Sequence, residues 1–593
     1  MTFPLYVIFL PIFLSLFCLL FRKAAGWIAL LTSALVFVVS VYLFFLGGVN
    51  SPILGFKAFK LNESIFMAAA FLTFLIILYS MKFMEGKKRT REYYAYLLVT
   101  LGSTAGALFA ADYLLLLCFW GISGATLYML IGIGGEEAAG AAKKSLLIIA
   151  GSDALMILGI AIIWGATNSF QIGARPLVPT GFLPGIAFLC LTAGAFAKAG
   201  AIPLHTWIPD SAEFAPTTVM ALLPGALDKL LGIYLLLRIC FNIFILETNS
   251  PLSLFLMAMG SITIIVGVMG ALLQHNIKKL LSFHAVSQVG YMVLGIGTGV
   301  PVAIAGGVFH MFNNAIYKAL LFLIGGAVER QTRTTELDRL GGLAKFMPIT
   351  FICTLIAALS ISGVPPFNGF VSKWMIYQGI VELAKNSPYW IIWLLAAMFG
   401  SALTLASFMK IIHAVFLGQW SDTTAKTREA PWPMCFPMIT LAVLCVLFGV
   451  FAYALPLAYL ILPSFQAVNF PGIWNPTLAT ALLIIGLLAG LLIYSLGNLK
   501  TTTSKPAYIG GEIFEEKTVK VTGTEFYNTI RDWGPLDRIY HLAEKKYFDI
   551  YELGKSFVFW VGAGLSWLQN GRAHTYLAWM LLGSIVLVYF LVR

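Results

Sequence analysis

Five lysines lie within stretches of sequence that are otherwise apolar enough to cross a lipid bilayer. They are Lys198, Lys229, Lys318, Lys373 and Lys410. A lysine at the centre of a bilayer costs about 2.5–3.5 kcal/mol on insertion scales, so five cost roughly 15 kcal/mol, comparable with the net stability of a domain. Snorkelling to the membrane surface is an alternative for each, above all for Lys410. The set predicts embedded amines that bind and release protons.

Two of these lysines lie beside a predicted break in their helix. Lys198 precedes Pro203, and Lys373 follows Pro365 and Pro366. Proline lacks a backbone N–H and clashes with the preceding helical turn, so both spans should be interrupted helices whose freed backbone groups line a cavity or are buried in protein. Paired breaks in corresponding positions of two halves indicate inverted repeats around an ion site near the middle of the membrane.

Two further spans carry polar residues along one helical face. The first face holds His310, Asn314 and Lys318, spaced four residues apart. The second face holds His284, Ser287, Gln288 and Tyr291. Each set falls on one side of a helix because its spacing is close to the helical repeat. A line of polar groups through the membrane is one interpretation, and ordinary hydrogen bonding between packed helices is the other.

The elements that hold these residues are predicted to be membrane-spanning helices. Of the 593 residues, 60% are hydrophobic and only 11% are charged, and the mean hydropathy is +0.89. Such a composition is typical of an integral membrane protein. We expect about sixteen spans in an all-α fold. They lie near residues 3–21, 26–46, 64–84, 93–110, 112–133, 144–166, 185–203, 217–239, 252–272, 281–299, 301–326, 346–381 (one long, broken span), 390–416, 435–462, 475–496 and 575–592.

The spans group into two antiporter-like halves of five, related as inverted repeats, with breaks in spans 7 and 12. The expected parts are N-terminal helices (1–92), the first half (93–240, spans 4–8), the second half (251–416, spans 9–13), spans 14 and 15 (435–496), a lateral arm (497–574) and a last span (575–593).

The lateral arm is predicted to be one long amphipathic helix. Apolar and charged residues alternate at helical period from Leu536 to Val558, and Pro535 stands near the start. About 35 residues at 1.5 Å each would reach roughly 50 Å along the membrane surface or along a neighbouring subunit. A simple solvated helix is the alternative.

The distribution of positive charge predicts the orientation. Of the 38 lysines and arginines, 27 fall in loops on one side of the predicted spans and 6 on the other. The richer side is expected to be cytoplasmic, which puts both termini outside and the arm on the cytoplasmic side. The net charge of +12 therefore reflects membrane topology, and we expect no nucleic-acid partner.

Cysteine and histidine usage predicts that this chain holds no cofactor or metal. The seven cysteines are scattered singly without a C-x-x-C pair, and the seven histidines show no spacing typical of haem ligation. Iron–sulfur ligation and a disulfide framework are therefore not expected. Any redox chemistry must occur in another subunit.

Six stretches resemble the antiporter-like subunits of respiratory complex I and its relatives, in particular the long subunit with a lateral helix. They are AKAGAIPLHTWIPDSAEFAPTTVMALL, the Lys229 segment, LLQHNIKKLLSFHAVSQVGYMVLGIG, FHMFNNAIYKALLFLIGGAVE, LGGLAKFMP and SGVPPFNGFVSKW. The resemblance is clearest from about residue 95 to 420. It implies that Lys198 serves the first half-channel, that Lys229 and His310 link to the centre, that Lys318 is the central lysine and that Lys373 lies on the exit side.

The sequence departs from that family in two places. The family usually has a glutamate after a tryptophan in span 5 as partner of the first lysine, whereas this chain has Trp120 and Gly121; Pro224 stands where many long subunits have histidine. Asp153 and Asp228 are the acids well inside spans, so either could replace the glutamate. We favour Asp153, in the neighbouring span, and expect its carboxylate within about 4–6 Å of the Lys198 ammonium or joined to it through one water.

By this resemblance, the chain is a proton- or sodium-translocating subunit of a redox-driven complex in a prokaryotic inner membrane. The missing glutamate and the arm sequence look closest to energy-converting, hydrogenase-type complexes. Iron–sulfur, NiFe or flavin centres would then lie in peripheral redox subunits, and other membrane-arm subunits, antiporter-like and quinone- or hydrogenase-linking, together with lipids would be direct partners. A multisubunit cation/proton antiporter and a membrane scaffold with degenerate channels are the alternatives.

Overall fold

The computed structural model describes residues 3–46, 54–419, 427–465, 468–472, 474–496, 524, 527–569 and 571–592. The chain divides into two compact units, Met1–Thr529 and Ile530–Arg593. Thirteen helices in the described part are long and apolar enough to cross a membrane. Each of the sixteen predicted spans contains at least one helix, so the expectation of an all-α polytopic membrane protein is confirmed.

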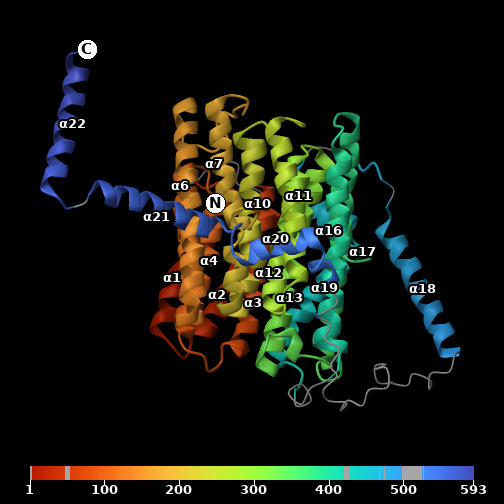
Figure 1. Cartoon of the computed structure of the whole chain (residues 1–593). Helices are drawn as coiled ribbons and strands as arrows, with labels where there is room; N and C mark the ends of the chain where they lie inside the picture. Colours follow the sequence, from red (N-terminus) through yellow and green to blue (C-terminus); the bar gives the residue numbers. More distant parts are fainter. Residues whose placement is uncertain are drawn as a thin grey trace. The chain divides into compact units, whose positions relative to one another are not determined.

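The first unit is a bundle of long helices that run side by side (Figure 1). Three helices come first: α1 (Phe3–Leu20), α2 (Ala25–Leu46) and α3 (Lys60–Phe83). The first half follows as α4 (Thr90–Phe109), α5 (Tyr113–Ile131), α6 (Ala139–Thr167), α7 (Phe182–Ala199), α8 (Trp207–Phe214), α9 (Thr217–Leu222) and α10 (Asp228–Arg238). A π-helical turn, Leu223–Leu227, joins α9 to α10, and a second, Ile239–Ile243, follows α10.

The second half repeats this plan. It consists of α11 (Pro251–Leu272), α12 (Ile277–Gly297), α13 (Pro301–Thr332), α14 (Pro348–Ser362), α15 (Asn368–Glu382) and α16 (Trp390–Ile411). The fourth span of each half is interrupted, since α7 ends before Gly200 and α14 ends before Gly363, both with a φ of +81°. Each half contains five spans. Because five is an odd number, the second half starts on the opposite face of the membrane and is inverted relative to the first.

One predicted span of the first unit is discontinuous. The span expected at 435–462 ends as α17 (Trp432–Val450) and restarts as a π-helical segment, Tyr453–Ile461, which contains Pro456. Proline removes one backbone donor and favours such a local widening of the helix. The next helix, α18 (Pro476–Leu496), exposes most of its apolar side chains.

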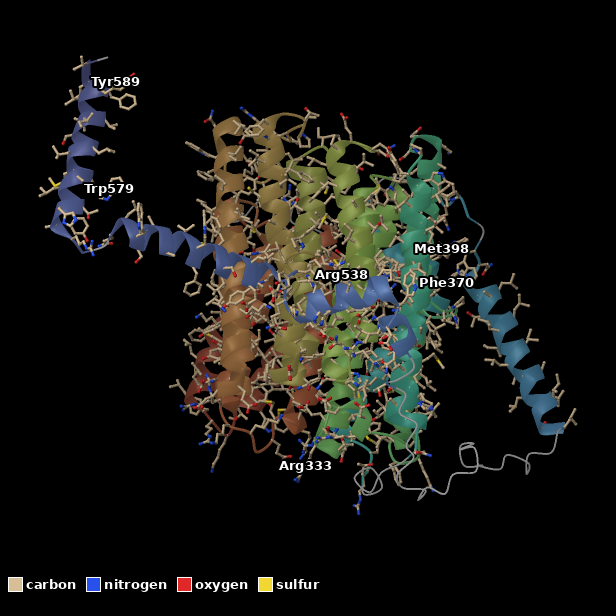
Figure 2. All side chains as sticks on the ribbon, viewed as in Figure 1. Arg333, Phe370, Met398, Arg538, Trp579 and Tyr589 are labelled. Carbon is tan, nitrogen blue, oxygen red and sulfur yellow. The ribbon has the colours of Figure 1, made fainter. Side chains whose placement is uncertain are left out.

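The predicted arm is not one continuous helix. The second unit contains α20 (Gly534–Glu544), α21 (Ile550–Leu568) and α22 (Ala573–Val592); a short helix, α19 (Asn528–Arg531), leads into it. Lys546 takes a left-handed conformation with a φ of 61° and separates α20 from α21, so the prediction of an unbroken helix of about 35 residues is wrong. Residues 497–523 of the arm lie outside the described part. Trp579 and Tyr589 project from α22 (Figure 2), and both are exposed.

The most buried spans are those that carry the polar residues. Thr217–Ile243, Ile277–Gly297 and Pro301–Thr332 are almost completely enclosed by the other helices. Polar groups placed there are shielded from both lipid and water, and must be satisfied by one another or by backbone groups.

Candidate functional site

All five predicted lysines are buried within the bundle. Their exposed fractions do not exceed 2%, so none of them snorkels to a membrane surface. Each of the five ammonium groups makes a hydrogen bond. Their partners differ, and the differences define the site.

Lys198 forms the ion pair at the centre of the first half. Its Nζ lies 3.7 Å from Oδ1 of Asp228, and both side chains are completely buried. The same ammonium donates to Ser123 Oγ at 2.9 Å and lies 5.4 Å from the centroid of the Trp120 ring. A buried charge needs this combination of countercharge, hydrogen bond and aromatic face.

The carboxylate that lies within 4.0 Å of Lys198 is that of Asp228, the acid that was not favoured, and the expected approach of Asp153 to about 4–6 Å stays a prediction. Oδ1 of Asp153 accepts a hydrogen bond of 3.0 Å from the Trp120 indole N–H, so Asp153 is linked to Lys198 through Trp120. The reason lies in the backbone before α10. The π-helical turn Leu223–Leu227 holds one residue more per turn than an α-helix, which changes the phase of the following helix and brings Asp228 to α7.

Lys229 and Lys373 each bind the carboxyl end of a broken helix. Lys229 Nζ donates to the carbonyl of Ala199 at 2.5 Å, where α7 ends. Lys373 Nζ donates to the carbonyl of Ile361 at 2.9 Å and to that of Ser362 at 3.4 Å, where α14 ends. Carbonyls at a helix end have no intrahelical donor, and the helix dipole places partial negative charge there. Both breaks therefore act as binding sites for an ammonium group.

Glycine at each break lets the ammonium approach the backbone. A Cβ atom at Gly200 would lie 3.1 Å from Lys229 Nζ, and one at Gly363 would lie 3.0 Å from Lys373 Cδ. Both glycines also have the positive φ that disfavours other residues. Glycine is therefore required at both positions, for conformation and for space.

Lys410 binds a third helix end. Its Nζ donates to the carbonyls of Leu272 and Gln274, both at 2.9 Å, where α11 ends. Lys318 instead donates to the Leu281 carbonyl within α12 at 2.9 Å and lies 5.9 Å from the Phe408 ring centroid. Among the described residues, no carboxylate lies within 4.0 Å of the Lys229, Lys318 or Lys373 amines.

Two buried histidines make hydrogen bonds among the polar residues of the second half. His310 bonds through Nδ1 to Ser372 Oγ at 2.9 Å and through Nε2 to Gln288 Oε1 at 3.1 Å. Ser372 precedes Lys373, so His310 is joined to the second broken span. His284 Nε2 lies 2.8 Å from Ser407 Oγ, and its ring centroid lies 4.8 Å from that of Phe408. Phe408 thus lies close to both His284 and Lys318.

Several buried polar atoms near this line have no hydrogen-bond partner in the described part. They are Asn314 Nδ2 and Oδ1, Gln288 Nε2, Asn313 Oδ1, Asn368 Nδ2, His284 Nδ1 and both oxygens of Asp228. Unpaired buried polar groups are costly, and water commonly satisfies them. These atoms are therefore positions inside the bundle where water could bind.

Sequence reasoning missed the backbone carbonyls, which side-chain patterns do not reveal, and the serine hydroxyls that bond to the Lys198 amine and to the His310 and His284 rings. Ser123, Ser372 and Ser407 are all completely buried. Serines within apolar spans were the available signal. In the described part, no three His, Cys, Asp or Glu side chains come together in a way that could hold a metal ion.

The chain resembles known membrane proteins over most of its length. Residues 110–404 match the family model described as NADH:quinone oxidoreductase/Mrp antiporter, TM. A Na(+)/H(+) antiporter subunit of Alkalihalophilus pseudofirmus is 32% identical over 415 residues, which are 66% of this chain and 83% of the relative. A Na(+)/H(+) antiporter subunit of Staphylococcus haemolyticus is 32% identical over 409 residues, 64% of this chain and 50% of the relative. The match thus spans about half the length of the second relative.

Solved structures with the same fold extend this likeness. A chain of the membrane-bound sulfane sulfur reductase, an archaeal respiratory membrane complex, matches with a TM-score of 0.82 and 25% identity over 100% of both chains. A chain of the Mrp complex from Dietzia sp. DQ12-45-1b has a TM-score of 0.69 and 21% identity, over 77% of this chain and 95% of that chain. A chain of respiratory complex I from Thermus thermophilus has a TM-score of 0.67 and 21% identity, over 77% and 97%.

Proposed function

Because the chain belongs to the NADH:quinone oxidoreductase/Mrp antiporter family of membrane subunits, we propose that it moves protons across the membrane along its buried lysines. The observation that carries this proposal is the placement of the amines. Lys198 faces a carboxylate, whereas Lys229, Lys373 and Lys410 face helix ends. Each amine has a partner that can stabilise its positive charge, but that partner does not hold the amine permanently in the charged form.

The ion pair is the switch in this proposal. Burial disfavours a charged amine, and a nearby carboxylate favours it. A small movement of Asp228 away from Lys198 would weaken the 3.7 Å pair and favour release of the Lys198 proton. Asp228 and Lys229 are consecutive in α10, so the same movement would shift Lys229 against the Ala199 carbonyl. The first broken helix and the ion pair would then respond together.

The polar groups of the second half complete the route. From Lys318, protons would pass through the region of Asn314, Gln288 and His310 to Ser372 and Lys373. Unpaired amide atoms of Asn314 and Gln288 offer positions for bridging waters. His284 and Lys410 form a second branch.

We propose that the chain works within a larger complex. Asp153 lies midway along α6 and is partly exposed. Lipid would be an expensive environment for that carboxylate, even with the Trp120 hydrogen bond. Gly121 and Gly151 lie nearby on α5 and α6, and space lies open beside both, so another membrane subunit could approach closely there. Such a subunit, with a donor facing Asp153, fits this surface better than lipid.

For the complex itself, we propose a redox-driven respiratory type rather than a gradient-driven antiporter. What supports it is the likeness over the whole length, C-terminal unit included, to a chain of an archaeal respiratory membrane complex. Redox centres, whether iron–sulfur, NiFe or flavin, would then belong to peripheral partner subunits. The chain would lie in a prokaryotic cell membrane with both termini outside and the arm on the cytoplasmic side, as its loop charges predict.

A Na⁺/H⁺ antiporter is the second candidate, because the curated relatives at 32% identity carry that name. The test is to purify the intact complex through a tag on this chain and reconstitute it in liposomes. A redox-driven pump moves protons only when electron donor and acceptor are supplied, whereas an antiporter moves them in response to an imposed sodium gradient alone. If the complex assembles correctly but moves protons under neither condition, the result favours the scaffold alternative.

A further inference from the structure

A pocket of about 290 Å³ opens at the end of the bundle where α3 begins and α10 ends. It lies away from the lysine line described above. Its polar lining comes from Lys57, Gln171, Arg238 and Asn242, and Phe59 forms part of the wall. These residues come from segments far apart in the sequence, so the fold builds the pocket.

The polar side chains of this pocket have unused hydrogen-bond donors. The Lys57 ammonium and the Gln171 and Asn242 amides make no side-chain hydrogen bond in the described part of the chain, and no acid lines the pocket. Arg238 uses Nη1 to donate to Tyr234 Oη at 2.7 Å, but its buried Nε has no partner. In the described part of the chain no carboxylate lies within 4.0 Å of the Lys57 or Arg238 cation, and two such cations favour an anion.

Arg238 is held in place independently of any ligand. Its guanidinium lies 5.4 Å from the Phe59 ring centroid and 5.7 Å from that of Tyr234. Tyr234 in turn donates to the Leu108 carbonyl at 2.9 Å. The neighbouring acid in sequence, Asp112, accepts from the Leu115 N–H at 2.8 Å and caps α5. The arginine is therefore fixed, and the closest acid along the chain has another role.

Apolar side chains stand exposed beside these lining residues. Phe170 precedes Gln171, Phe241 precedes Asn242, and Ile245 follows in the same segment; all three are exposed. A basic pocket with an apolar border at the end of a membrane bundle is suited to a lipid headgroup, because acyl chains can follow the apolar surface.

We propose that this pocket binds a phosphate-type oxyanion, carried by an anionic phospholipid or present as free phosphate. Arginine and lysine together match the charge and acceptor geometry of a phosphate, and the two amides supply further donors. A bound headgroup would tie α3 to α10, the helix that carries Asp228 and Lys229. The inference does not depend on the proposed proton route.

The test measures binding to the purified full-length chain with three probes. They are dihexanoyl-phosphatidylglycerol, dihexanoyl-phosphatidylcholine and inorganic phosphate, each titrated and followed by native mass spectrometry. The variant is Lys57→Gln combined with Arg238→Gln. The matched control is Arg175→Gln, which removes an exposed cation in the loop between α6 and α7. Gln171 in the same loop lines the pocket, but Arg175 does not.

We expect wild type and the Arg175→Gln control to bind phosphatidylglycerol over phosphatidylcholine, and the double variant to bind it at least about tenfold more weakly. If inorganic phosphate at similar concentration displaces phosphatidylglycerol, the site binds a free anion. If phosphate does not displace it, the site binds the lipid headgroup. Should the double variant fold poorly, the single change of exposed Lys57 to Gln must still weaken binding. Equal phosphatidylglycerol binding by all folded variants, without phosphate binding, would overturn the proposal.

Discussion

Lys198 and Asp228 face each other at 3.7 Å with both side chains completely buried, while the next residue, Lys229, points to the carbonyl of Ala199. Adjacent residues of α10 thus serve different partners on α7. One supplies a countercharge to a lysine, and the other is itself a lysine bound to a helix end. The predictions below follow from this division of roles.

Asp228→Asn is expected to reduce proton transport more than Asp153→Asn. Removing Asp228 leaves the buried Lys198 amine without its countercharge, which disfavours the charged form of the amine, and about 1.4 kcal/mol in a barrier changes a rate tenfold. We therefore expect transport by the reconstituted complex to fall at least about tenfold for Asp228→Asn. Asp153→Asn retains an acceptor for the Trp120 indole and serves as the matched control. A larger loss for Asp153→Asn would show that the wrong acid has been assigned to Lys198.

Gly200→Ala and Gly363→Ala should each destabilise the chain and displace a lysine. A left-handed backbone costs alanine roughly 1–2 kcal/mol relative to glycine, and the new methyl group would meet Lys229 Nζ or Lys373 Cδ. Thermal unfolding in detergent and proton transport should both decrease. Gly486→Ala in α18 is the control, because nothing lies within 4 Å of the added methyl. If all three variants behave alike, the glycines do not position the amines.

Deleting the chain beyond residue 497 is expected to weaken assembly of the membrane complex. The segment removed includes α21 and α22, most of whose apolar side chains are exposed, and such faces require lipid or other subunits. Native gel electrophoresis of complexes isolated through an N-terminal tag would measure the change. Normal assembly and normal transport by the truncated chain would exclude a clamping role for the arm.

The contact of Thr524 with Asp338 should depend on pH only under acidic conditions. Burial raises the pKa of Asp338, but hydrogen bonds from Thr524 and His275 outweigh it and leave this pKa below its usual value. A lowered carboxyl pKa stabilises the fold above the unfolded value of about 3.9, and the stabilisation is lost as the pH falls through the folded value.

Wild type should therefore melt at a higher temperature than Asp338→Asn above about pH 5, with convergence below about pH 4. Differential scanning fluorimetry of both proteins across this pH range would measure the difference in melting temperature. Asp537→Asn, in α20, is the control and should match wild type throughout. Convergence already at neutral pH would mean that the carboxylate is not the group responsible.

Much of the architecture could be predicted because apolar length and proline position determine it. The breaks after Lys198 and before Lys373 followed from Pro203, Pro365 and Pro366, and all five lysines proved to be buried. The acid opposite Lys198 could not be predicted. Side-chain periodicity assumes a regular helix, whereas the π-helical turn before Asp228 changes the phase of α10.

In the arm too, the side-chain pattern alone did not reveal an irregular backbone. Its amphipathic pattern continues across Lys546, and no glycine or proline marks that position as a break, so one helix was expected where two exist. A left-handed lysine is uncommon and carries little sequence signal. The carbonyl partners of Lys229, Lys373 and Lys410 were equally hidden, because the backbone is the same at every residue.

The most direct test of the proton route is transport by a Lys318→Ala complex in proteoliposomes. Lys318 is completely buried and donates to the Leu281 carbonyl, and alanine is a strong helix former, so α13 should persist. Exposed Lys385→Ala is the matched control. Internal pH would be recorded while the complex is driven by its electron donor or by a sodium gradient. We predict that Lys318→Ala assembles but moves no protons while the control transports normally; full transport by Lys318→Ala would contradict the proposal.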